Sequence, residues 1–253
     1  MQTVVVTGGN RGIGYAVCEA LSRQDFRVVA VNRNPAAPVP PGVEVVVGDL
    51  SSRRTVTALS EALAQACPRI DVLVHNAGVW PTRLRHNEDG IEESFAVNHL
   101  APFQLNLALE SRLRRVVQVS AGLYVKGRVD PARTPRGEDF HRLRTYCNTK
   151  RANLMLMPLF ARRWKDAGVT IDAVHPGVIR TNLGDTSGVV AGLWRQVKRL
   201  MPPPATGARP VVRLVSDQGT GRYFNVNREE PLRFDSAQAS LLWDQAGELT
   251  GAG

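Results

Sequence analysis

The stretch Thr7-Gly8-Gly9-Asn10-Arg11-Gly12-Ile13-Gly14 decides how this chain is organised. An apolar run precedes it at residues 4–6, and apolar side chains recur at helical spacing after it, over residues 15–21. A strand, a glycine-rich turn and a helix in this order form a cradle for the phosphates of a dinucleotide. The glycines allow a tight turn, and the helix N-terminus offers free N–H groups to an anion. Glycines also end ordinary strands, so the rest of the chain must decide whether this turn binds a ligand.

Length and composition are those of an ordinary globular protein. The chain has 253 residues, of which 43% are hydrophobic and 22% charged, and this length suits one domain spanning residues 1–253. No apolar run approaches the roughly 20 residues that cross a bilayer, and residues 1–6 show no basic leader. We therefore expect no membrane span and no export signal. The three cysteines lack the spacing of a zinc site or a disulfide framework, which indicates no metal site and a reducing, cytoplasmic setting.

The charge balance is strongly basic, with 32 lysines and arginines against 23 aspartates and glutamates and a formal net charge of +9. Nucleic acid is one class of partner for such a chain. The arginines are scattered along the sequence, however, rather than gathered in one segment. We therefore expect a preference for anionic small ligands, including a phosphorylated cofactor, and no nucleic-acid surface.

Apolar runs and helical patterns alternate along the whole chain. Strands are predicted at residues 4–6, 28–31, 43–47, 72–74, 116–119, 170–174 and 223–226. Helices are predicted after Ser51 or Ser52, over about 90–109, 146–166 and 239–249. This alternation predicts an α/β fold, a single-domain Rossmann-type doubly wound parallel sheet flanked by helices. Ligands of such sheets bind beyond the carboxyl ends of the strands, where the unusual residues of this chain fall.

The end of the second strand bears on the choice of cofactor. It reads Asn32-Arg33-Asn34, with no acidic residue. An acidic side chain there binds the ribose 2′-hydroxyl of NAD, whereas an arginine accommodates the 2′-phosphate of NADP. Arg33 together with Arg11 therefore favours NADP(H). The alternative is that both are exposed arginines of an arginine-rich protein.

The chemistry is indicated by Tyr146 and Lys150, which stand four residues apart and so share one face of the helix predicted there. A nearby ammonium favours the phenolate and lowers a tyrosine pKa that is ordinarily about 10. Such a tyrosine can give a proton to a developing alkoxide or take one from an alcohol. The pair occurs in one chain with the glycine-rich turn, with Asn76-Ala77-Gly78 and with Pro176-Gly177.

With these motifs in this order, the chain resembles the short-chain dehydrogenases/reductases over essentially its whole length, and most closely their retinol-dehydrogenase-like and carbonyl-reductase-like branch. The resemblance implies a catalytic acid/base at Tyr146, its partner at Lys150, and at Asn98 the asparagine that holds a proton-relay water with the lysine. It also implies a set of cofactor-binding residues: Gly8, Asn10, Arg11, Gly12, Ile13, Gly14, Arg33, Asp49, Leu50, Asn76, Ala77, Gly78, Tyr146, Lys150, Pro176, Gly177 and Thr181.

One position departs from this family pattern. Relatives in that branch carry two serines at the end of the fifth strand, and the second is catalytic. This chain has Ser120 followed by Ala121, and an ungapped comparison places Ala121 in the catalytic position. Neighbouring strand side chains point to opposite faces, so the hydroxyl that orients a substrate carbonyl is expected to be missing unless a bulge brings Ser120 into the site.

These observations predict an NADPH-dependent oxidoreductase that reduces a carbonyl or oxidises a secondary alcohol, and we expect it to act in a biosynthetic pathway. Trp80, Leu123, Tyr124 and Trp194 are placed to line a pocket for a bulky, partly apolar small molecule, and residues 183–204 form a candidate substrate lid. The alternatives are a redox-silent member that catalyses cyclisation, dehydration or epimerisation, and a cofactor-binding sensor. Many relatives form dimers or tetramers, so the resemblance implies a homodimer or homotetramer.

Overall fold

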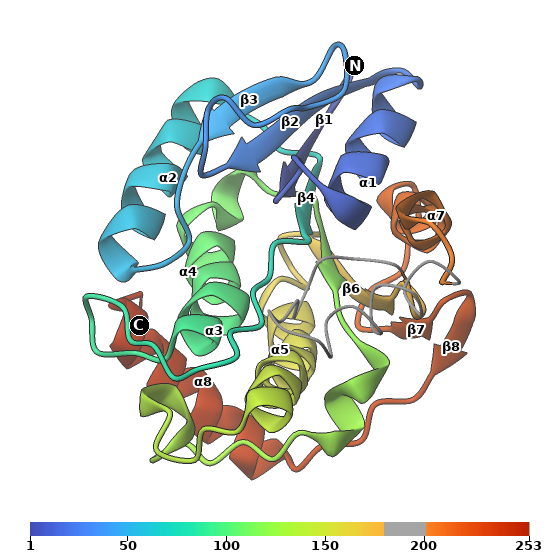
Figure 1. Cartoon of the computed structure of the whole chain (residues 1–253). Coiled ribbons are helices and arrows are strands. Elements are labelled where there is room, and N and C mark those ends of the chain that lie inside the picture. Colours follow the sequence, from blue (N-terminus) through green and yellow to red (C-terminus); the bar gives the residue numbers. More distant parts are fainter. Residues whose placement is uncertain (180–200, 253) are drawn as a thin grey trace.

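A twisted sheet runs through the middle of the molecule, with its strands in the order β3-β2-β1-β4-β5-β6-β7-β8 (Figure 1). The computed structural model describes residues 1–179 and 201–252. The strands are β1 (Gln2–Thr7), β2 (Phe26–Asn32), β3 (Glu44–Val47), β4 (Val72–His75), β5 (Arg115–Val119), β6 (Thr170–His175), β7 (Tyr223–Asn225) and β8 (Arg228–Glu230). All neighbouring pairs are parallel except β7 and β8. The predicted doubly wound fold is confirmed, and its strand order reverses direction between β1 and β4.

Helices cover both faces of the sheet (Figure 1). The α-helices are α1 (Gly12–Ser22), α2 (Arg53–Ala66), α3 (Glu93–Phe95), α4 (Ala101–Ala108), α5 (Arg142–Arg163), α7 (Pro204–Val215) and α8 (Ser236–Thr250). Shorter turns are the π-helical η1 (Ala96–Leu100) and the 3-10 helices η2 (Glu110–Arg112), η3 (Gly122–Lys126) and η4 (Thr134–Arg136). One apolar cluster joins the sheet to α2, α4, α5 and α8, and another joins it to α1 and α7.

The strands supply both clusters by alternation of their side chains. Leu73 of β4 and Val116 of β5 face the larger cluster, while Val74 and Val117, one residue further on, face the smaller. All four are fully buried. Parallel strands that are covered by helices on both faces have no solvent-exposed side, so their sequences are continuous apolar runs. This is why the strands could be predicted from the sequence.

The first residue was predicted correctly for one helix and wrongly for another. Ser52 caps α2 as expected, since its hydroxyl accepts from the Thr55 N–H at 3.3 Å. The start predicted for the long helix at Tyr146 is wrong, because α5 begins at Arg142. The cap there is His141, whose Nδ1 accepts from the Arg144 N–H at 3.3 Å. Histidine is an uncommon capping residue, so the preceding polar segment gave no start signal.

Two further elements were missed. Helix α7 contains Pro210, which has no N–H to donate within the helix. Because proline is unusual inside helices, the sequence did not predict this helix. Its buried side nevertheless packs through Val211 and Leu214 into the smaller cluster. Strand β8 is short and polar, without an alternating pattern. The predicted lid at 183–204 lies outside the described residues up to position 200, and Pro204 is the first residue of α7.

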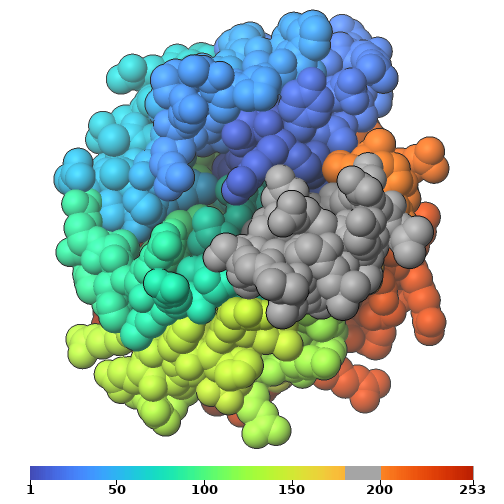
Figure 2. Space-filling view, viewed as in Figure 1, coloured from blue at the N-terminus to red at the C-terminus, as the bar shows by residue number. Residues whose placement is uncertain are grey.

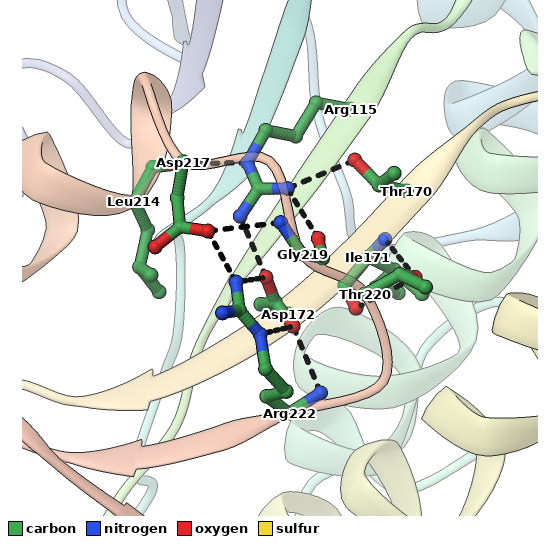
Figure 3. A network of polar contacts seen from close by, with 9 residues as sticks. All are labelled: Arg115, Thr170, Ile171, Asp172, Leu214, Asp217, Gly219, Thr220 and Arg222. Atoms are coloured by element: carbon green, nitrogen blue, oxygen red, sulfur yellow. Dashed lines mark hydrogen bonds and ion pairs between the residues drawn. The ribbon is translucent and has the colours of Figure 1, made fainter.

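A network of buried charges joins the sheet to the segment after α7 (Figure 3). The Arg115 guanidinium, on β5, pairs with Asp172 of β6 at 2.6 Å, and Asp172 also pairs with Arg222 at 2.8 Å. Arg115 in addition donates to the carbonyls of Leu214 and Gly219. Both members of the Arg115–Asp172 pair are buried, so their charges stabilise the fold only as a pair. This network fixes the position of α7 relative to β5 and β6.

Candidate active site

The glycine-rich turn at the end of β1 is shaped by contacts that only glycine permits. Gly8 has a φ of +69°. A Cβ on Gly14 would lie 2.2 Å from the Gly8 carbonyl oxygen and 2.4 Å from the Asn76 side-chain nitrogen, so α1 packs directly on the turn. Gly12, with a φ of +56°, has no atom from elsewhere in residues 1–179 or 201–252 within 4 Å of its Cβ position. Among these residues the turn is therefore packed against the protein at Gly8 and Gly14 and uncrowded at Gly12.

Asn10 and Ile13 also belong to this turn. Asn10 is partly buried between Gly9 and Arg11. Ile13 points toward α7, where it lies 3.3 Å from the Cβ position of Gly207. The turn and α7 are thus in direct contact.

The predicted turn Asn76-Ala77-Gly78, at the end of β4, is bound to the end of β1. The Asn76 side-chain amide donates to the carbonyls of Thr7 and Gly8, at 2.9 and 3.2 Å. The N–H groups of Asn76 and Ala77 both donate to the Thr7 hydroxyl, at 3.1 and 3.0 Å. These four bonds hold the two strand ends together at the point where the strand order reverses, which is where doubly wound sheets bind ligands.

The next residue of the turn brings the predicted catalytic residues together. A Cβ on Gly78 would lie 3.4 Å from the Asn98 side-chain oxygen and 3.9 Å from the Lys150 Nζ. Lys150 in turn donates to the carbonyl of Val119, the last residue of β5, at 3.1 Å. The turn after β4, the end of β5 and helix α5 therefore converge on one place. In the space-filling view the teal residues after β4 lie between the blue N-terminal segments and the yellow-green α5 (Figure 2).

Asn98 uses its side chain to hold the turn after β4. Its Oδ1 accepts from the Val79 N–H at 2.7 Å, and its Nδ2 donates to the Val79 carbonyl at 2.9 Å. The same Nδ2 lies 3.2 Å from the Thr149 hydroxyl on α5. Asn98 stands in the π-helical turn η1, and such turns recur at functional sites.

The main chain of Asn98 is held from the other side. Pro102, four residues on, has no N–H, so the Asn98 carbonyl receives no ordinary helical hydrogen bond. Asn153 of α5 donates to it instead, at 2.7 Å. The Asn153 Oδ1 must then be an acceptor, so His99 Nδ1, 2.8 Å away, carries the proton. Sequence reasoning missed Asn153 and His99, although Asn153 lies three residues after Lys150 and so near its helix face.

Tyr146 and Lys150 lie on one face of α5 as predicted, with the Lys150 Nζ 5.8 Å from the centre of the phenol ring. Their electrostatics differ from the expectation that the lysine lowers the tyrosine pKa. Burial raises the pKa of Tyr146 above its ordinary value, and burial lowers the pKa of Lys150 to about 8. Before any ligand binds, removal from water outweighs the attraction between phenolate and ammonium. Tyr146 is therefore a protonated phenol at neutral pH.

Two buried histidines, His75 and His99, each form a hydrogen bond with an asparagine side chain. His75, at the end of β4, is fully buried with Nε2 2.8 Å from the Asn106 side-chain oxygen. Burial lowers the pKa of His75 to about 4, and the charge of Lys150 acts in the same direction. Burial likewise lowers the pKa of His99 to about 4. Both imidazoles are therefore neutral at neutral pH.

Ser120 and Ala121 follow β5 directly. Ala121 has extended backbone, with φ −143° and ψ 140°, so consecutive side chains point to opposite sides. Ser120 is buried, and its hydroxyl has no hydrogen-bond partner among the described residues. Ala121 is partly exposed. The role of Ser120 in the site stays a prediction.

The residues predicted to bind the adenosine half follow β2 and β3. Arg33 directly follows β2 and is exposed, as is Arg11 at the glycine-rich turn. Asp49 and Leu50 follow β3 and are partly buried, with the Asp49 carboxylate accepting from the Ser51 N–H at 3.1 Å. All four stand at the carboxyl end of the sheet, next to the glycine-rich turn.

The residues predicted to secure the nicotinamide follow β6. Pro176 is buried, and Gly177 has a φ of +92° with its Cβ position 3.5 Å from a Val226 methyl group. Val226 itself has a φ of 57°, which is strained for a β-branched residue. Its N–H donates to the His175 carbonyl at 2.8 Å, which fixes the end of β6 to the β7–β8 hairpin. Thr181 lies outside the described residues.

Comparison with known proteins agrees with this geometry. Residues 2–188 match the protein-family model described as short chain dehydrogenase. The chain belongs to this family. A Streptomyces sp. (strain C5) protein provisionally named daunorubicin C-13 ketoreductase DnrU is 34% identical over 272 residues, covering 99% of this chain and 93% of that protein. Human retinol dehydrogenase 14 is 32% identical over 290 residues, covering 99% of this chain and 86% of that protein.

Two solved structures share the fold. An uncharacterised protein from Mycobacterium paratuberculosis superposes with a TM-score of 0.80 at 26% identity, covering 99% of this chain and 94% of that one. A short-chain dehydrogenase from Burkholderia cenocepacia J2315, solved in complex with NADP, gives a TM-score of 0.70 at 22% identity, covering 90% of this chain and 98% of that one. The second likeness shows the fold alone.

The residues at the turn fit the nicotinamide dinucleotide that this family binds. Gly12 is uncrowded by the described residues and begins α1, where a pyrophosphate would meet free N–H groups. Asn32, the last residue of β2, is 2% exposed, and both polar atoms of its side chain lack a partner among the described residues. Such buried unpaired groups are rare, and the hydroxyls of a ribose would satisfy them.

The described residues contain neither a membrane-spanning helix nor a cluster of metal ligands. Across 1–179 and 201–252, no helix is both long and apolar enough to cross a membrane. Within the same ranges, no three histidine, cysteine or acidic side chains are grouped as metal ligands. All three cysteines are buried free thiols.

Proposed function

We propose that this short-chain dehydrogenase is an NADPH-dependent oxidoreductase that reduces a carbonyl, or oxidises a secondary alcohol, on a bulky, partly apolar small molecule. The observation that carries the proposal is the convergence of Asn98, Tyr146 and Lys150 beside Gly78, next to the glycine-rich turn. The relatives named as a ketoreductase and as retinol dehydrogenases support this class of reaction.

In the proposed reaction the chain's own residues handle the proton. Bound NADPH supplies the hydride. Tyr146, a protonated phenol because burial raises its pKa, donates its proton to the substrate oxygen as negative charge develops there. Lys150 stabilises the resulting phenolate, since its ammonium lies on the same helix face. Asn98 holds the turn that carries Gly78, and the lack of a side chain at Gly78 lets the Asn98 amide and the Lys150 ammonium lie close to this turn.

NADPH is proposed over NADH because of charge at the adenosine end. Arg33 and Arg11 are both exposed beside the glycine-rich turn, where they can pair with a 2′-phosphate. The described residues directly after β2 include no acidic side chain that would compete for a ribose hydroxyl. A cytoplasmic setting with free thiols, a homodimeric or homotetrameric assembly and a place in a biosynthetic pathway belong to the same proposal.

The alternative, a redox-silent acid/base reaction, is motivated by Ala121 in the position of the catalytic serine. We do not favour it. The two relatives named above are a ketoreductase and a retinol dehydrogenase, and the proposed proton donor and its lysine are retained. Loss of one orienting hydrogen bond slows reduction by about a hundredfold rather than abolishing it.

Substitution Tyr146→Phe tests the proposal. Oxidation of NADPH and of NADH is followed at 340 nm with a panel of ketones, for the wild type and the variant. We expect wild-type turnover that is faster with NADPH, and loss of at least a hundredfold in kcat in the variant, with unchanged NADPH binding by fluorescence. Equal turnover in the two proteins would contradict the assignment of Tyr146.

A further inference from the structure

The indole of Trp80 lies face to face with the phenol ring of Tyr146. The ring centres are 4.8 Å apart and the planes differ by 15°. Trp80 follows the turn after β4, and Tyr146 lies near the start of α5. The two residues come from segments 66 positions apart in the sequence, so no local pattern reveals this contact.

Two further contacts hold the indole in this orientation. Its Nε1–H donates to the carbonyl of Arg142, in the first turn of α5. The residue before it, Val79, is held at both its N–H and its carbonyl by the Asn98 side chain. An aromatic side chain fixed in this way loses little freedom when a ligand binds against it, which favours affinity.

The geometry relates the indole to the position of a substrate. The O–H of a phenol lies near the plane of its ring, and an acceptor carbonyl bonds along that direction. A carbonyl bound to the Tyr146 hydroxyl therefore lies close to the indole, because the two rings are stacked. The part of the indole that Tyr146 leaves uncovered is a flat surface on which a ring conjugated with that carbonyl can stack. Tyr146 is only 7% exposed, whereas Trp80 is partly exposed and so available to the substrate.

We propose that Trp80 is a specificity-determining residue that selects substrates whose carbonyl is attached to a flat aromatic or conjugated ring. This inference rests on the proposed function, since it places the substrate carbonyl at Tyr146. A flat ring stacked on an indole binds with roughly threefold to tenfold higher affinity than a puckered ring in the same place. A puckered saturated ring cannot lie flat on the indole.

Two ketones of equal carbon count test the inference: acetophenone, which is flat, and cyclohexyl methyl ketone, which is puckered. We expect the wild type to have a KM for acetophenone that is roughly threefold to tenfold lower. Trp80→Ala should abolish this ratio, and Trp80→Phe should restore most of it. Any loosening of Tyr146 in Trp80→Ala lowers kcat for both ketones alike. Thr82→Ala, an exposed position of the same loop, is the control and should keep the ratio.

Binding without turnover separates this inference from the proposed reaction. In the presence of NADP⁺, acetophenone should shift the indole N–H resonance of Trp80, assigned by its loss in Trp80→Phe, more than cyclohexyl methyl ketone does. A shift without reduction of either ketone would count against the proposed reaction alone. No shift with acetophenone up to its solubility, or a KM ratio that survives Trp80→Ala, would overturn the role of Trp80.

Discussion

The side-chain amide of Asn153 donates to the main-chain carbonyl of Asn98 at 2.7 Å and so joins α5 to the π-helical turn η1. Pro102 has no N–H, so this carbonyl lacks the ordinary helical hydrogen bond from the residue four positions on. The bond therefore fixes the turn that carries Asn98 against the side of α5 that also carries Lys150.

Replacement of Asn153 by leucine should lower kcat about tenfold, because the turn beneath Gly78 loses its anchor. The free energy of unfolding should fall by about 1–3 kcal/mol, the cost of a buried carbonyl left unpaired. Initial rates and urea denaturation measure the two effects, with NADPH affinity as the control. A loss of stability at unchanged kcat would show that the bond is structural only.

The two buried histidines should make the protein sensitive to acid. His75 and His99 have a pKa of about 4 in the folded chain against 6.5 when unfolded. Between these values the unfolded chain binds protons that the folded chain does not, so the free energy of unfolding falls as the pH falls. The loss at pH 5.5 is about 1 kcal/mol for each histidine.

Urea denaturation at pH 7.5 and 5.5 measures this slope. In His99→Gln, which has no group that titrates in this range, the difference between the two pH values should shrink by about 1 kcal/mol. The same slope in the variant and the wild type would rule out a buried neutral His99 as a source of the acid sensitivity.

The pair Ser120 and Ala121 should respond unequally to substitution. Ala121→Ser restores a hydroxyl at the partly exposed position and should raise kcat for ketone reduction by roughly tenfold to a hundredfold. Ser120→Ala removes a buried hydroxyl that has no partner among the described residues, and should change kcat less than twofold. If Ser120→Ala instead abolished turnover, Ser120 would be the orienting residue and the alignment of Ala121 would be wrong.

The buried ion pair of Arg115 and Asp172 should be costly to break and less costly to remove. Asp172→Leu leaves the Arg115 charge without its buried partner and should lower the free energy of unfolding by about 3–5 kcal/mol. The double variant Arg115→Met, Asp172→Leu should recover part of this loss. Recovery stays incomplete because the carbonyls of Leu214 and Gly219 lose their donor. Urea denaturation measures these losses. A double variant whose loss in free energy of unfolding equals the sum of the losses in the two single variants would contradict this coupling.

The sequence predicted the fold and much of the candidate site because both depend on local patterns. Buried parallel strands read as apolar runs, Ser52 is a common cap, and a spacing of four places Tyr146 and Lys150 on one helix face. The strand-end motifs converge because parallel strands bring their carboxyl ends to one edge of the sheet.

What the sequence did not predict depends on contacts between distant segments. The bond from Asn153 to Asn98 and the stack of Trp80 on Tyr146 appear only once α5 has packed against the turn after β4. The raised pKa of Tyr146 has the same origin, since burial is a property of the packed chain. Helix α7 was missed for a different reason. Pro210 removes one helical hydrogen bond, which argues against a helix, but the packing of α7 against α1 outweighs this loss.

Transfer of deuterium from NADPH tests the central claim most directly. The protein is incubated with acetophenone and NADPH carrying deuterium at both C4 positions, and the product is analysed by mass spectrometry. We expect a secondary alcohol with one deuterium at its carbinol carbon from the wild type, and a loss of at least a hundredfold in its rate of formation in Tyr146→Phe. Product without deuterium, or equal product from the two proteins, would contradict reduction by hydride with Tyr146 as the proton donor.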